Sequence, residues 1–376
     1  MDQITPCFST WRITRTGSRE IIEGVVRPAH RGPSPELARH LATWPHASYW
    51  VGPDRAELVL VRPTQPHPRE PWLLLGALLA VTVVCTLGAG ATLAGTYLAP
   101  VRIGLPGMVF GGLAFFPEFL TGPLELMASG WTFAVPLLGI LLVHELGHYV
   151  VARQYGIDAS PPFFLPIPPT LSPLGSLGAF LKLRSPVVDR RQLLDVGAAG
   201  PLAGFVVALG VLAWGYSTST ALPGWFGFHG TYVEVGGTIY GLGDSILTQA
   251  FREWFHPADH AIRLSLPAFA GWAGALITGL NLLPLSQLDG GHIAFGLAGR
   301  RQRVIAILTV VALFYLSSLW SAWLVWIGLT FLVGGGRWSH PSVVYPERAV
   351  PRSRRLIGIL SAVVLVLTFV PVPFRP

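Results

Sequence analysis

The chain has 376 residues, of which 51% are hydrophobic and only 12% are charged. Soluble domains carry about 25% charged residues, so this chain has too few of them to cover a soluble globule of its length. The composition therefore excludes a soluble enzyme and indicates a polytopic membrane protein. Residues 1–70 hold nine of the 26 Lys and Arg residues, whereas residues 71–101 hold no charge at all. A soluble N-terminal piece is expected ahead of the first span.

Residues 1–70 predict a small α/β unit. Residues 11–14 and 57–61 have the apolar and β-branched composition of strands. Ser34 is followed by a proline and an acidic residue, which is typical of a helix start, and this helix is expected to end near residue 44. The unit is too small to be catalytic by itself.

The histidines and cysteines of the N-terminal unit show no metal-binding motif. Its four histidines share no ligand spacing and are interpreted as surface residues: His30, His40, His46 and His67. The two cysteines of the chain, Cys7 and Cys85, lie in different settings, so neither a disulfide framework nor a CxxC metal site is expected. Charges are scattered ahead of the first apolar run, so no secretory signal is expected.

Six apolar runs are candidates for membrane spans, since a span needs about 20 apolar residues. They cover residues 72–98, 131–152, 193–215, 264–285, 304–336 and 356–372. The fifth run is long for one helix, and Ser317, Ser318 and Ser321 could hold a tight reversal between two short helices. The expected fold class is therefore an all-α polytopic membrane protein with about six to seven transmembrane helices.

The distribution of basic residues predicts the orientation of these spans. With seven helices, alternate segments starting from the N-terminus hold 22 Lys and Arg residues, against four in the segments on the other side. The positive-inside rule then places the N-terminus in the cytoplasm. The segments 103–130 and 222–260 fall on the outer side and are interpreted as Gly/Pro-rich or interfacial loops.

The densest group of ionisable residues in a candidate span is His144, Glu145 and His148, in the pattern HExxH. Polar groups at membrane depth are costly, so they are functional candidates by default. Two histidines four residues apart lie about 40° apart around a helix axis, so both can reach one metal ion. Glu145 lies beside them as a carboxylate that can accept a proton from an attacking water. An accidental HExxH is expected on the order of 0.01 times in this chain, which favours a zinc site.

Catalytic zinc usually has three protein ligands, so a third is expected elsewhere. The candidates at membrane depth are Asp195, Asp289 and His292. The second and fourth spans run in the same direction and carry HExxH and Asp289 near their inner ends, so the two can meet at one depth. Asp195 follows Arg190 and Arg191 and is interpreted as their ion-pair partner at the membrane surface.

Asp289 and His292 compete as ligands, because residues three apart share one face of a helix. Gly290 and Gly291 are expected to end or bend the helix and to move His292 towards the cytoplasmic surface, which favours Asp289. An Asp-Gly turn at a helix terminus is the alternative interpretation of Asp289.

These motifs resemble those of the site-2 protease family of intramembrane zinc metalloproteases. The likeness comprises HExxH, the sequence NLLPLSQLDG at residues 281–290, and GPLAG at residues 200–204, which is similar to the family's G-x-x-x-(N/S/G) motif of close helix packing. It covers residues 72–335. One departure is that Leu282, and not proline, follows the motif asparagine. No segment is long enough for the PDZ domain that some bacterial members insert.

The resemblance implies one zinc ion per chain, held by His144, His148 and Asp289, with Glu145 as the general base. It implies that Asn281 helps to polarise the scissile carbonyl or holds the substrate chain. The implied activity is hydrolysis of peptide bonds within or near transmembrane helices, close to the cytoplasmic side of the bilayer. The implied partners are a single-pass transmembrane substrate and the lipid bilayer, and no nucleic acid is expected.

The resemblance also divides the chain into three parts. Residues 1–70 are the cytoplasmic unit, residues 71–335 are the intramembrane metalloprotease core, and residues 336–376 are a basic loop and a C-terminal transmembrane helix. Residues 163–184 resemble the family's membrane-associated β-loop, whose open edge would hold an extended substrate. A plain cytoplasmic loop is the alternative interpretation of that segment.

Two other classes of function compete with the protease. An ion or proton-coupled transporter would need polar residues spread across several spans from face to face, whereas here they are confined to the inner half of two spans. A catalytically inactive member of the same fold would be signalled by loss of Glu145 or of a ligand, and all of these residues are present. The sequence therefore favours the protease.

Overall fold

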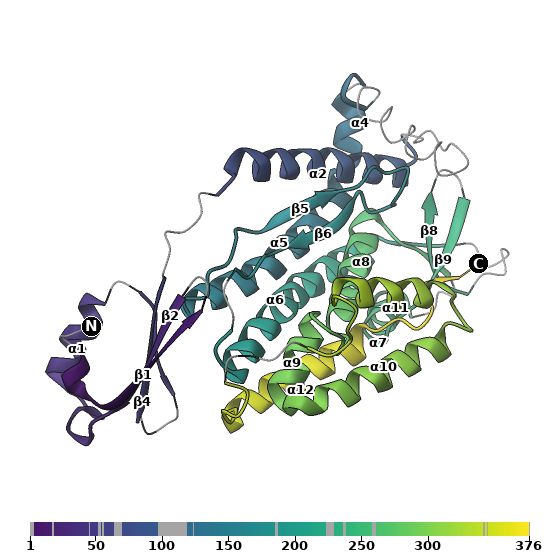
Figure 1. The fold of residues 1–376 in the computed structure, drawn as a ribbon. Coiled ribbons are helices and arrows are strands. Elements are labelled where there is room, and N and C mark those ends of the chain that lie inside the picture. Colours follow the sequence, from purple (N-terminus) through teal and green to yellow (C-terminus); the bar gives the residue numbers. More distant parts are fainter. Residues whose placement is uncertain are drawn as a thin grey trace.

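The computed structural model describes residues 4–16, 19–44, 46–51, 54, 56–63, 70–96, 119–122, 124–184, 187–222, 229–235, 238–257, 261–340, 343 and 345–375. His67 and most of the first expected outer loop lie outside these residues. Three helices lie side by side in the middle of the molecule: α5 (Trp131–Gln154), α6 (Arg190–Ser217) and α8 (Leu266–Asn281) (Figure 1).

Two further layers cover the central helices (Figure 1). On one side lie α2 (Trp72–Leu93), the short α4 (Leu124–Ser129) and an antiparallel pair of strands, β5 (Phe163–Pro166) and β6 (Ser176–Phe180). On the other side lie α9 (Asp289–Ala298), α10 (Gln302–Leu316), α11 (Ala322–Val333) and α12 (Arg352–Thr368), with the 3-10 turn η4 (Gly299–Arg301) before α10. The β-loop expected at residues 163–184 is therefore a hairpin that lies between α2 and α5.

Three of the described helices, α2, α5 and α6, are long and apolar enough to cross a membrane. The shortest of them has 22 residues, and at 1.5 Å per residue it reaches about 33 Å, slightly more than a bilayer core of about 30 Å. Helices α8, α10, α11 and α12 have 16, 15, 12 and 17 residues and are shorter than a perpendicular span. The structure thus supports a membrane protein through three helices, and the number of six to seven spans stays a prediction.

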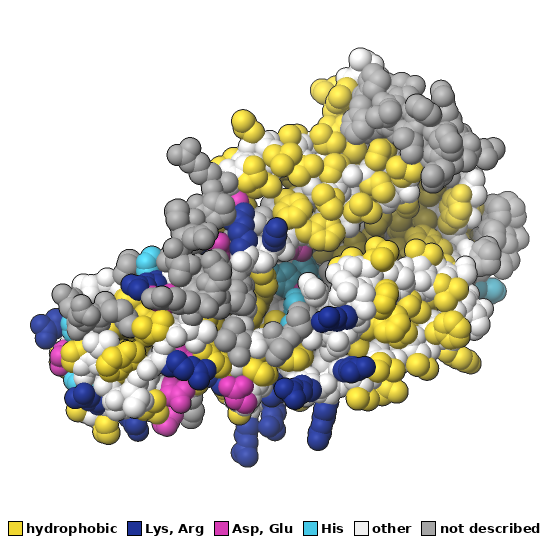
Figure 2. Space-filling model, viewed as in Figure 1, with side chains coloured by type: hydrophobic (Ala, Val, Ile, Leu, Met, Phe, Trp, Pro, Cys, Tyr) yellow, Lys and Arg dark blue, Asp and Glu magenta, His cyan; other side chains and the backbone are white. Residues whose placement is uncertain are grey.

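The outer surface of the helices is apolar. Figure 2 shows hydrophobic side chains over most of the visible helical part, whereas charged side chains gather around the N-terminal sheet and the adjoining loops. Leu73 of α2 is 92% exposed and Leu332 of α11 is 75% exposed. Side chains of this kind gain nothing from contact with water, so such a surface suits contact with lipid.

A five-stranded sheet at the end of the bundle remote from the N-terminal unit contradicts the all-α prediction (Figure 1). Its order is β11-β9-β8-β10-β7, with β7 (Thr220–Ala221), β8 (Gly230–Val235), β9 (Thr238–Leu242), β10 (Ala261–Arg263) and β11 (Phe374–Arg375). Helix α7 (Ile246–Phe255) connects β9 to β10. Thr, Tyr and Val residues in β8 and β9 favour strands, so the interpretation of residues 222–260 as a Gly/Pro-rich loop was wrong for this part. The glycines around the strands obscured their alternation.

The N-terminal unit is a four-stranded antiparallel sheet in the order β1-β2-β4-β3, with one helix. Its elements are η1 (Thr5–Cys7), β1 (Phe8–Thr16), β2 (Arg19–Val26), η2 (Pro28–His30), α1 (Pro35–Thr43), β3 (Ser48–Val51) and β4 (Glu57–Pro63). Successive residues of a strand face opposite sides. Ile22 and Leu60 therefore pack with Leu37 of α1, while Ile21 and Val59 pack on the opposite face against Tyr345. Both faces of this small sheet thus carry packed apolar side chains.

The long apolar run at residues 304–336 forms two helices, α10 and α11. The break falls at residues 317–321, where the serines allow a reversal. Leu313 of α10 and Trp323 of α11 belong to one buried cluster, so the two helices pack against each other.

Aromatic stacking fixes α5 against α8. The rings of Phe133 and Phe269 stack with centroids 5.7 Å apart, and Phe269 stacks on Trp272 at 5.6 Å. The indole N–H of Trp272 donates to the Gly243 carbonyl at 2.9 Å, so its one polar atom has a partner although the ring is buried. These contacts hold α5 and α8 together at the end of the bundle nearer the five-stranded sheet.

Candidate metal centre

Helix α5 carries His144, Glu145 and His148 on adjacent positions of one face, within its last three turns. All three are buried, with 4%, 8% and 7% of their surface exposed. Their ligand atoms lie within 4.8 Å of one another, and the two Nε2 atoms are 3.1 Å apart. The helical spacing therefore turns both imidazoles towards one point.

Asp289 meets these histidines from α9. Its Oδ2 lies 3.1 Å from Nε2 of His144, and its Oδ1 lies 3.2 Å from Nε2 of His148. Ligand atoms around a tetrahedral zinc ion lie about 3.2–3.5 Å apart, as bond lengths of about 2.0–2.1 Å require. Two imidazole nitrogens and a carboxylate at this spacing fit a zinc ion in both geometry and donor type.

The helix is interrupted before Asp289 and not after it. Helix α8 ends at Asn281, and α9 begins at Asp289 after an extended Leu288. Gly290 lies inside the first turn of α9, where an added Cβ would collide with the Leu282 carbonyl. The expectation that the glycines end the helix after Asp289 was therefore wrong, because they serve a close approach of two backbones.

Residues that follow α11 hydrogen-bond to the segment between α8 and α9. The N–H of Ser286, which has a φ of 45°, donates to the Trp338 carbonyl at 2.7 Å. His292 lines the same cavity as Asp289, and its Nδ1 lies 2.7 Å from Nε2 of His340. The His340 N–H donates to Oε1 of Gln302 at 2.9 Å. The structure thus gives His292 a partner in this segment and leaves Asp289 facing the histidines of α5.

Small residues of α6 make room for the histidine rings. A Cβ added at Gly200 would collide with the imidazole of His148, and one added at Gly204 would lie 3.1 Å from Cβ of His144. Gly147 faces the Ala199 carbonyl in the same close manner. The segment GPLAG therefore lets α6 lie directly against the part of α5 that bears the histidines.

The backbone of α6 orients His148. Its Nδ1 lies 2.7 Å from the Val196 carbonyl, which leaves Nε2 directed at Asp289. A hydrogen bond at the second ring nitrogen is the usual way to fix a ligand histidine. Sequence reasoning missed this contact, since every residue has a carbonyl and nothing in the pattern singles out Val196.

A cavity of about 210 Å³ opens beside the cluster. Asn281 lines it from the end of α8 and Gln287 from the segment between α8 and α9, while Phe180 and Leu181 line it from the β-loop. Histidine side chains are visible in a hollow on the face shown in Figure 2. Glu145 thus lines a cavity that is also bounded by the β-loop.

Asp195 lies away from this cluster. Both its oxygens accept from Nε of Arg354 at 3.0 Å, and Oδ2 accepts from the Tyr155 hydroxyl at 2.5 Å. Arg191 lies 3.9 Å from it, but Arg190 donates to the carbonyl of Gly296, so the expected pairing was half right. Burial and the hydrogen bond to Asp195 raise the pKa of Tyr155 to about 12.

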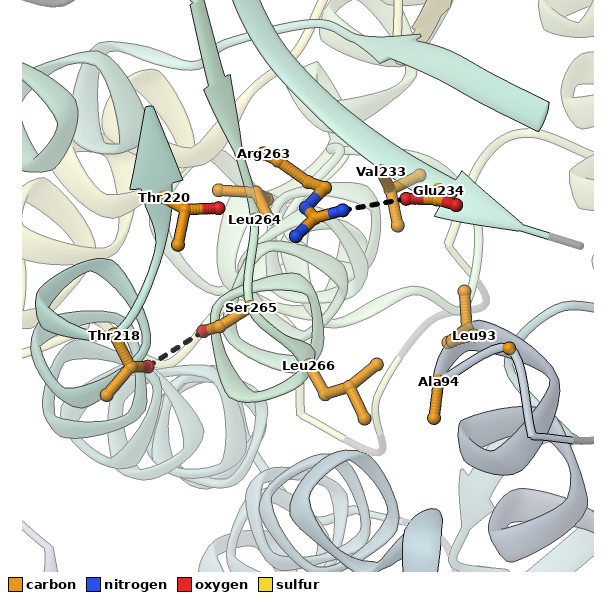
Figure 3. A pocket seen from close by; sticks show the side chains of 11 residues that line it. Leu93, Ala94, Thr218, Thr220, Val233, Glu234, Arg263, Leu264, Ser265 and Leu266 are labelled. Carbon is orange, nitrogen blue, oxygen red and sulfur yellow. Dashed lines mark hydrogen bonds and ion pairs between the residues drawn. The ribbon is translucent and has the colours of Figure 1, made fainter. Parts of the chain in front are cut away.

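A second pocket, of about 360 Å³, lies at the other end of the bundle (Figure 3). Arg263 pairs with Glu234 at 2.9 Å, and the hydroxyl of Thr218 donates to that of Ser265 at 2.9 Å. Its described lining residues include no histidine or cysteine. This pocket therefore lacks the imidazole nitrogens that line the smaller cavity beside α5.

Comparisons with known proteins agree with this geometry. The model of peptidase family M50 matches residues 132–319, half of the chain. Probable zinc metalloprotease EGY2, chloroplastic, of Arabidopsis thaliana is 33% identical over 260 residues, which cover 67% of this chain and 43% of the relative. Probable zinc metalloprotease EGY1, chloroplastic, of the same plant is 30% identical over 242 residues, 64% of this chain and 42% of the relative.

A third relative reaches further along the chain. Probable zinc metalloprotease EGY3, chloroplastic, of Oryza sativa subsp. indica is 28% identical over 319 residues, 80% of this chain and 48% of the relative. The chain spans less than half the length of these curated relatives. No solved structure matches it. The match to the family model over half of the chain, together with the HExxH cluster, shows that the chain belongs to peptidase family M50, the site-2 protease family.

Proposed function

We propose that this chain is an intramembrane zinc metalloendopeptidase that hydrolyses peptide bonds within or near transmembrane helices of membrane proteins. One observation carries the proposal. Nε2 of His144, Nε2 of His148 and the carboxylate of Asp289 converge within 3.2 Å of one another, with Glu145 beside them in a buried cluster. Membership of family M50 and the printed names of the relatives support it.

In this proposal His144, His148 and Asp289 hold one zinc ion. When bound, zinc supplies a positive charge that polarises a carbonyl and makes water more acidic. With only three side chains as ligands, the ion would remain able to bind a reactant, as catalytic sites require. The Val196 carbonyl would keep Nε2 of His148 turned towards the ion and Asp289.

Glu145 is the proposed general base. Its carboxylate would accept a proton from the attacking water and pass it to the leaving amine nitrogen. The helix places it directly after His144, so it lies beside the ligands without being needed as one. Its burial keeps bulk water from competing for the proton.

The β-loop and Asn281 are the proposed substrate-holding groups. The carbonyls of a transmembrane helix are hydrogen-bonded within the helix, so a substrate must unwind locally before it can be attacked. Among the described strands only β5 pairs with β6, and Phe180 of β6 lines the cavity. An unwound substrate would add to the other edge of β6 as a strand. Asn281, which also lines the cavity, would hold or polarise the scissile carbonyl.

The proposal includes the topology of the chain. Its six or seven spans come from the apolar runs of the sequence. With seven spans, the 22 basic residues on one side against four on the other favour a cytoplasmic N-terminus and cleavage near the cytoplasmic side. Residues 1–70 would be the cytoplasmic unit, residues 71–335 the protease core, and residues 336–376 a basic loop with a last transmembrane helix. The packing of β2, β3 and β4 against Tyr345, and the contact of Thr14 of β1 with its hydroxyl, support a common side for the first and third parts.

Co-expression with a panel of single-pass transmembrane segments in bacterial membranes tests this function. Each segment carries a tag at both ends, and mass spectrometry of the fragments locates the cut. We expect cuts within or beside the apolar segment that 1,10-phenanthroline suppresses and that Glu145→Gln abolishes. Identical fragments from the wild type and from Glu145→Gln would contradict the proposal.

A further inference from the structure

The N-terminal unit contains a second cluster of metal-ligand side chains. The sulfur of Cys7, a carboxylate oxygen of Glu36 and a ring nitrogen of His40 all lie within 4.8 Å of one another. Cys7 ends η1, while the other two residues lie on α1. The sequence separates these residues by about thirty positions, which is why their spacing showed no motif.

Packing of α1 brings the three side chains together. The Ser34 side chain accepts from the Leu37 N–H and starts the helix, so Glu36 and His40 lie four residues apart on one face. Leu37 and Cys7 belong to the same buried cluster, which holds the first turns of α1 over η1. The cluster is thus built on packed backbone and not on a surface loop.

His30 supplies a fourth donor beside the three. Its Nδ1 lies 2.8 Å from the Ser34 hydroxyl, and its Nε2 lies 4.0 Å from Oε2 of Glu36. A hydrogen bond at one ring nitrogen that leaves the other facing the ligand group is the usual arrangement of a metal-binding histidine. His30 and His40, interpreted from the sequence as surface residues, are half-buried and both lie near Glu36.

We propose that Cys7, His30, Glu36 and His40 form a second metal site, which binds a divalent transition metal ion such as Zn²⁺. One thiolate, two imidazoles and one carboxylate are a donor set for zinc and its neighbours, whereas Ca²⁺ and Mg²⁺ prefer oxygen alone. Shifts of about 1 Å would bring the ligand atoms of Cys7, Glu36 and His40, now within 4.8 Å of one another, to the separations of about 3.3–3.8 Å in a tetrahedral zinc site. His30, with its Nε2 4.0 Å from Glu36, would approach as the fourth ligand.

Burial distinguishes a metal site from a reactive thiol. Cys7 is 0% exposed, so a substrate cannot approach its sulfur. The side chain of Glu36 is 51% exposed and that of His30 is 19% exposed, which gives an ion a path from solvent. The ion would lie at the rim of the sheet, between the buried sulfur and the face of α1.

The role of this site is structural. A unit of about 70 residues buries a small core, and domains of this size gain stability from a bound metal. The four ligands come from η1, η2 and α1, so one ion would tie the segments that precede, follow and cover the hairpin of β1 and β2.

Cobalt titration of the full-length chain in detergent tests the proposal. The chain has only two cysteines, and Cys85 lies on α2 outside the cluster, so a thiolate-to-cobalt charge-transfer band reports Cys7. The HExxH cluster contains nitrogen and oxygen donors alone and gives no such band. After metal removal with EDTA, we expect the band to rise to saturation with Co²⁺ and to disappear when Zn²⁺ is added.

Matched variants complete the test. We expect Cys7→Ser to abolish the band and Cys85→Ala to keep it. We expect His40→Ala to weaken cobalt binding at least about tenfold, whereas His46→Ala, an exposed histidine outside the cluster, leaves it unchanged. Absence of the band from the wild type overturns the proposal. So does unchanged cobalt affinity in Glu36→Gln, an exposed position where substitution leaves the core intact.

Discussion

Glu145 is the residue on which hydrolysis depends most directly in the proposed function. Its carboxylate lies in the HExxH cluster, but the histidines and Asp289 already provide three ligands. We expect Glu145→Gln to lower cleavage by about 10³-fold, because removal of a general base costs about 10²–10⁴-fold.

Zinc content measured by atomic absorption is the control for this variant. The amide is nearly isosteric with the carboxylate, so one zinc ion per chain should remain. Cleavage within tenfold of the wild type in a zinc-loaded variant would show that another group accepts the proton.

Asp289 and His292 can be separated by metal binding alone. Asp289 touches both α5 histidines, whereas the ring of His292 is paired with His340. We expect Asp289→Ala to weaken zinc binding more than about 100-fold, since even loss of a second-shell partner costs about 10–100-fold. His292→Ala should retain metal and at least part of the activity. If His292→Ala empties the site while Asp289→Ala leaves it filled, the ligand assignment is wrong.

At the scale of elements, the contact of α5 with α6 depends on glycine. A Cβ at Gly200 would collide with the imidazole of His148, whereas a Cβ at Gly210, on the same helix, meets nothing within 4 Å. We expect Gly200→Ala to push the ring away from Asp289 and to weaken zinc binding at least about tenfold, as a misplaced ligand does.

Gly210→Ala is the matched control on α6 and should bind zinc as the wild type does. Isothermal titration with Zn²⁺ after metal removal measures both variants. Equal affinity of the two variants would mean that the close approach at Gly200 is not needed for the site.

At the scale of the whole molecule, Arg348 joins the N-terminal sheet to the membrane core. Its guanidinium pairs with Glu23 of β2, lies 3.9 Å from Asp189 at the start of α6, and lies 4.6 Å from the ring centroid of Tyr345. The Tyr345 hydroxyl lies 2.6 Å from the hydroxyl of Thr14. These contacts connect parts of the chain more than 300 residues apart.

We expect Arg348→Ala to loosen the N-terminal sheet. Hydrogen bonds to charged groups contribute about 1.5–3 kcal/mol, so amide exchange in β2 and β4 should accelerate at least about tenfold. Hydrogen exchange with mass spectrometry measures this, with Arg355→Ala, an exposed arginine of α12, as the control. Unchanged protection in Arg348→Ala would show that other contacts hold the sheet in place.

The orientation can be tested with two introduced cysteines. Thr43, at the end of α1, and Ser217, at the end of α6, are exposed and lie at opposite ends of the molecule. The native Cys7 and Cys85 are 0% exposed and should not react. An impermeant maleimide added to intact cells should label Ser217→Cys and not Thr43→Cys. Labelling of Thr43→Cys alone would invert the proposed topology.

Local patterns in the sequence determined several features. The charge-poor composition indicates a membrane protein. Because a charged residue at membrane depth is costly wherever it lies, HExxH could be identified as a candidate functional site. His144, Glu145 and His148 share one helix face because helical periodicity depends only on spacing along the chain. Ser34 likewise predicted the start of α1, because an N-cap side chain bonds to backbone N–H groups in the first turn of its own helix.

The contacts between residues far apart in the sequence were decided by the tertiary structure alone. The contact of His144 with Asp289 crosses 145 positions, and the orientation of His148 depends on a backbone carbonyl that any residue would supply. The five-stranded sheet pairs β11 with β9, although more than 130 residues separate them. Cys7 and His40 likewise meet only because α1 packs on η1. Spacing along the chain encodes contacts within a helix or strand, but contacts between elements depend on how whole faces pack, which no local pattern contains.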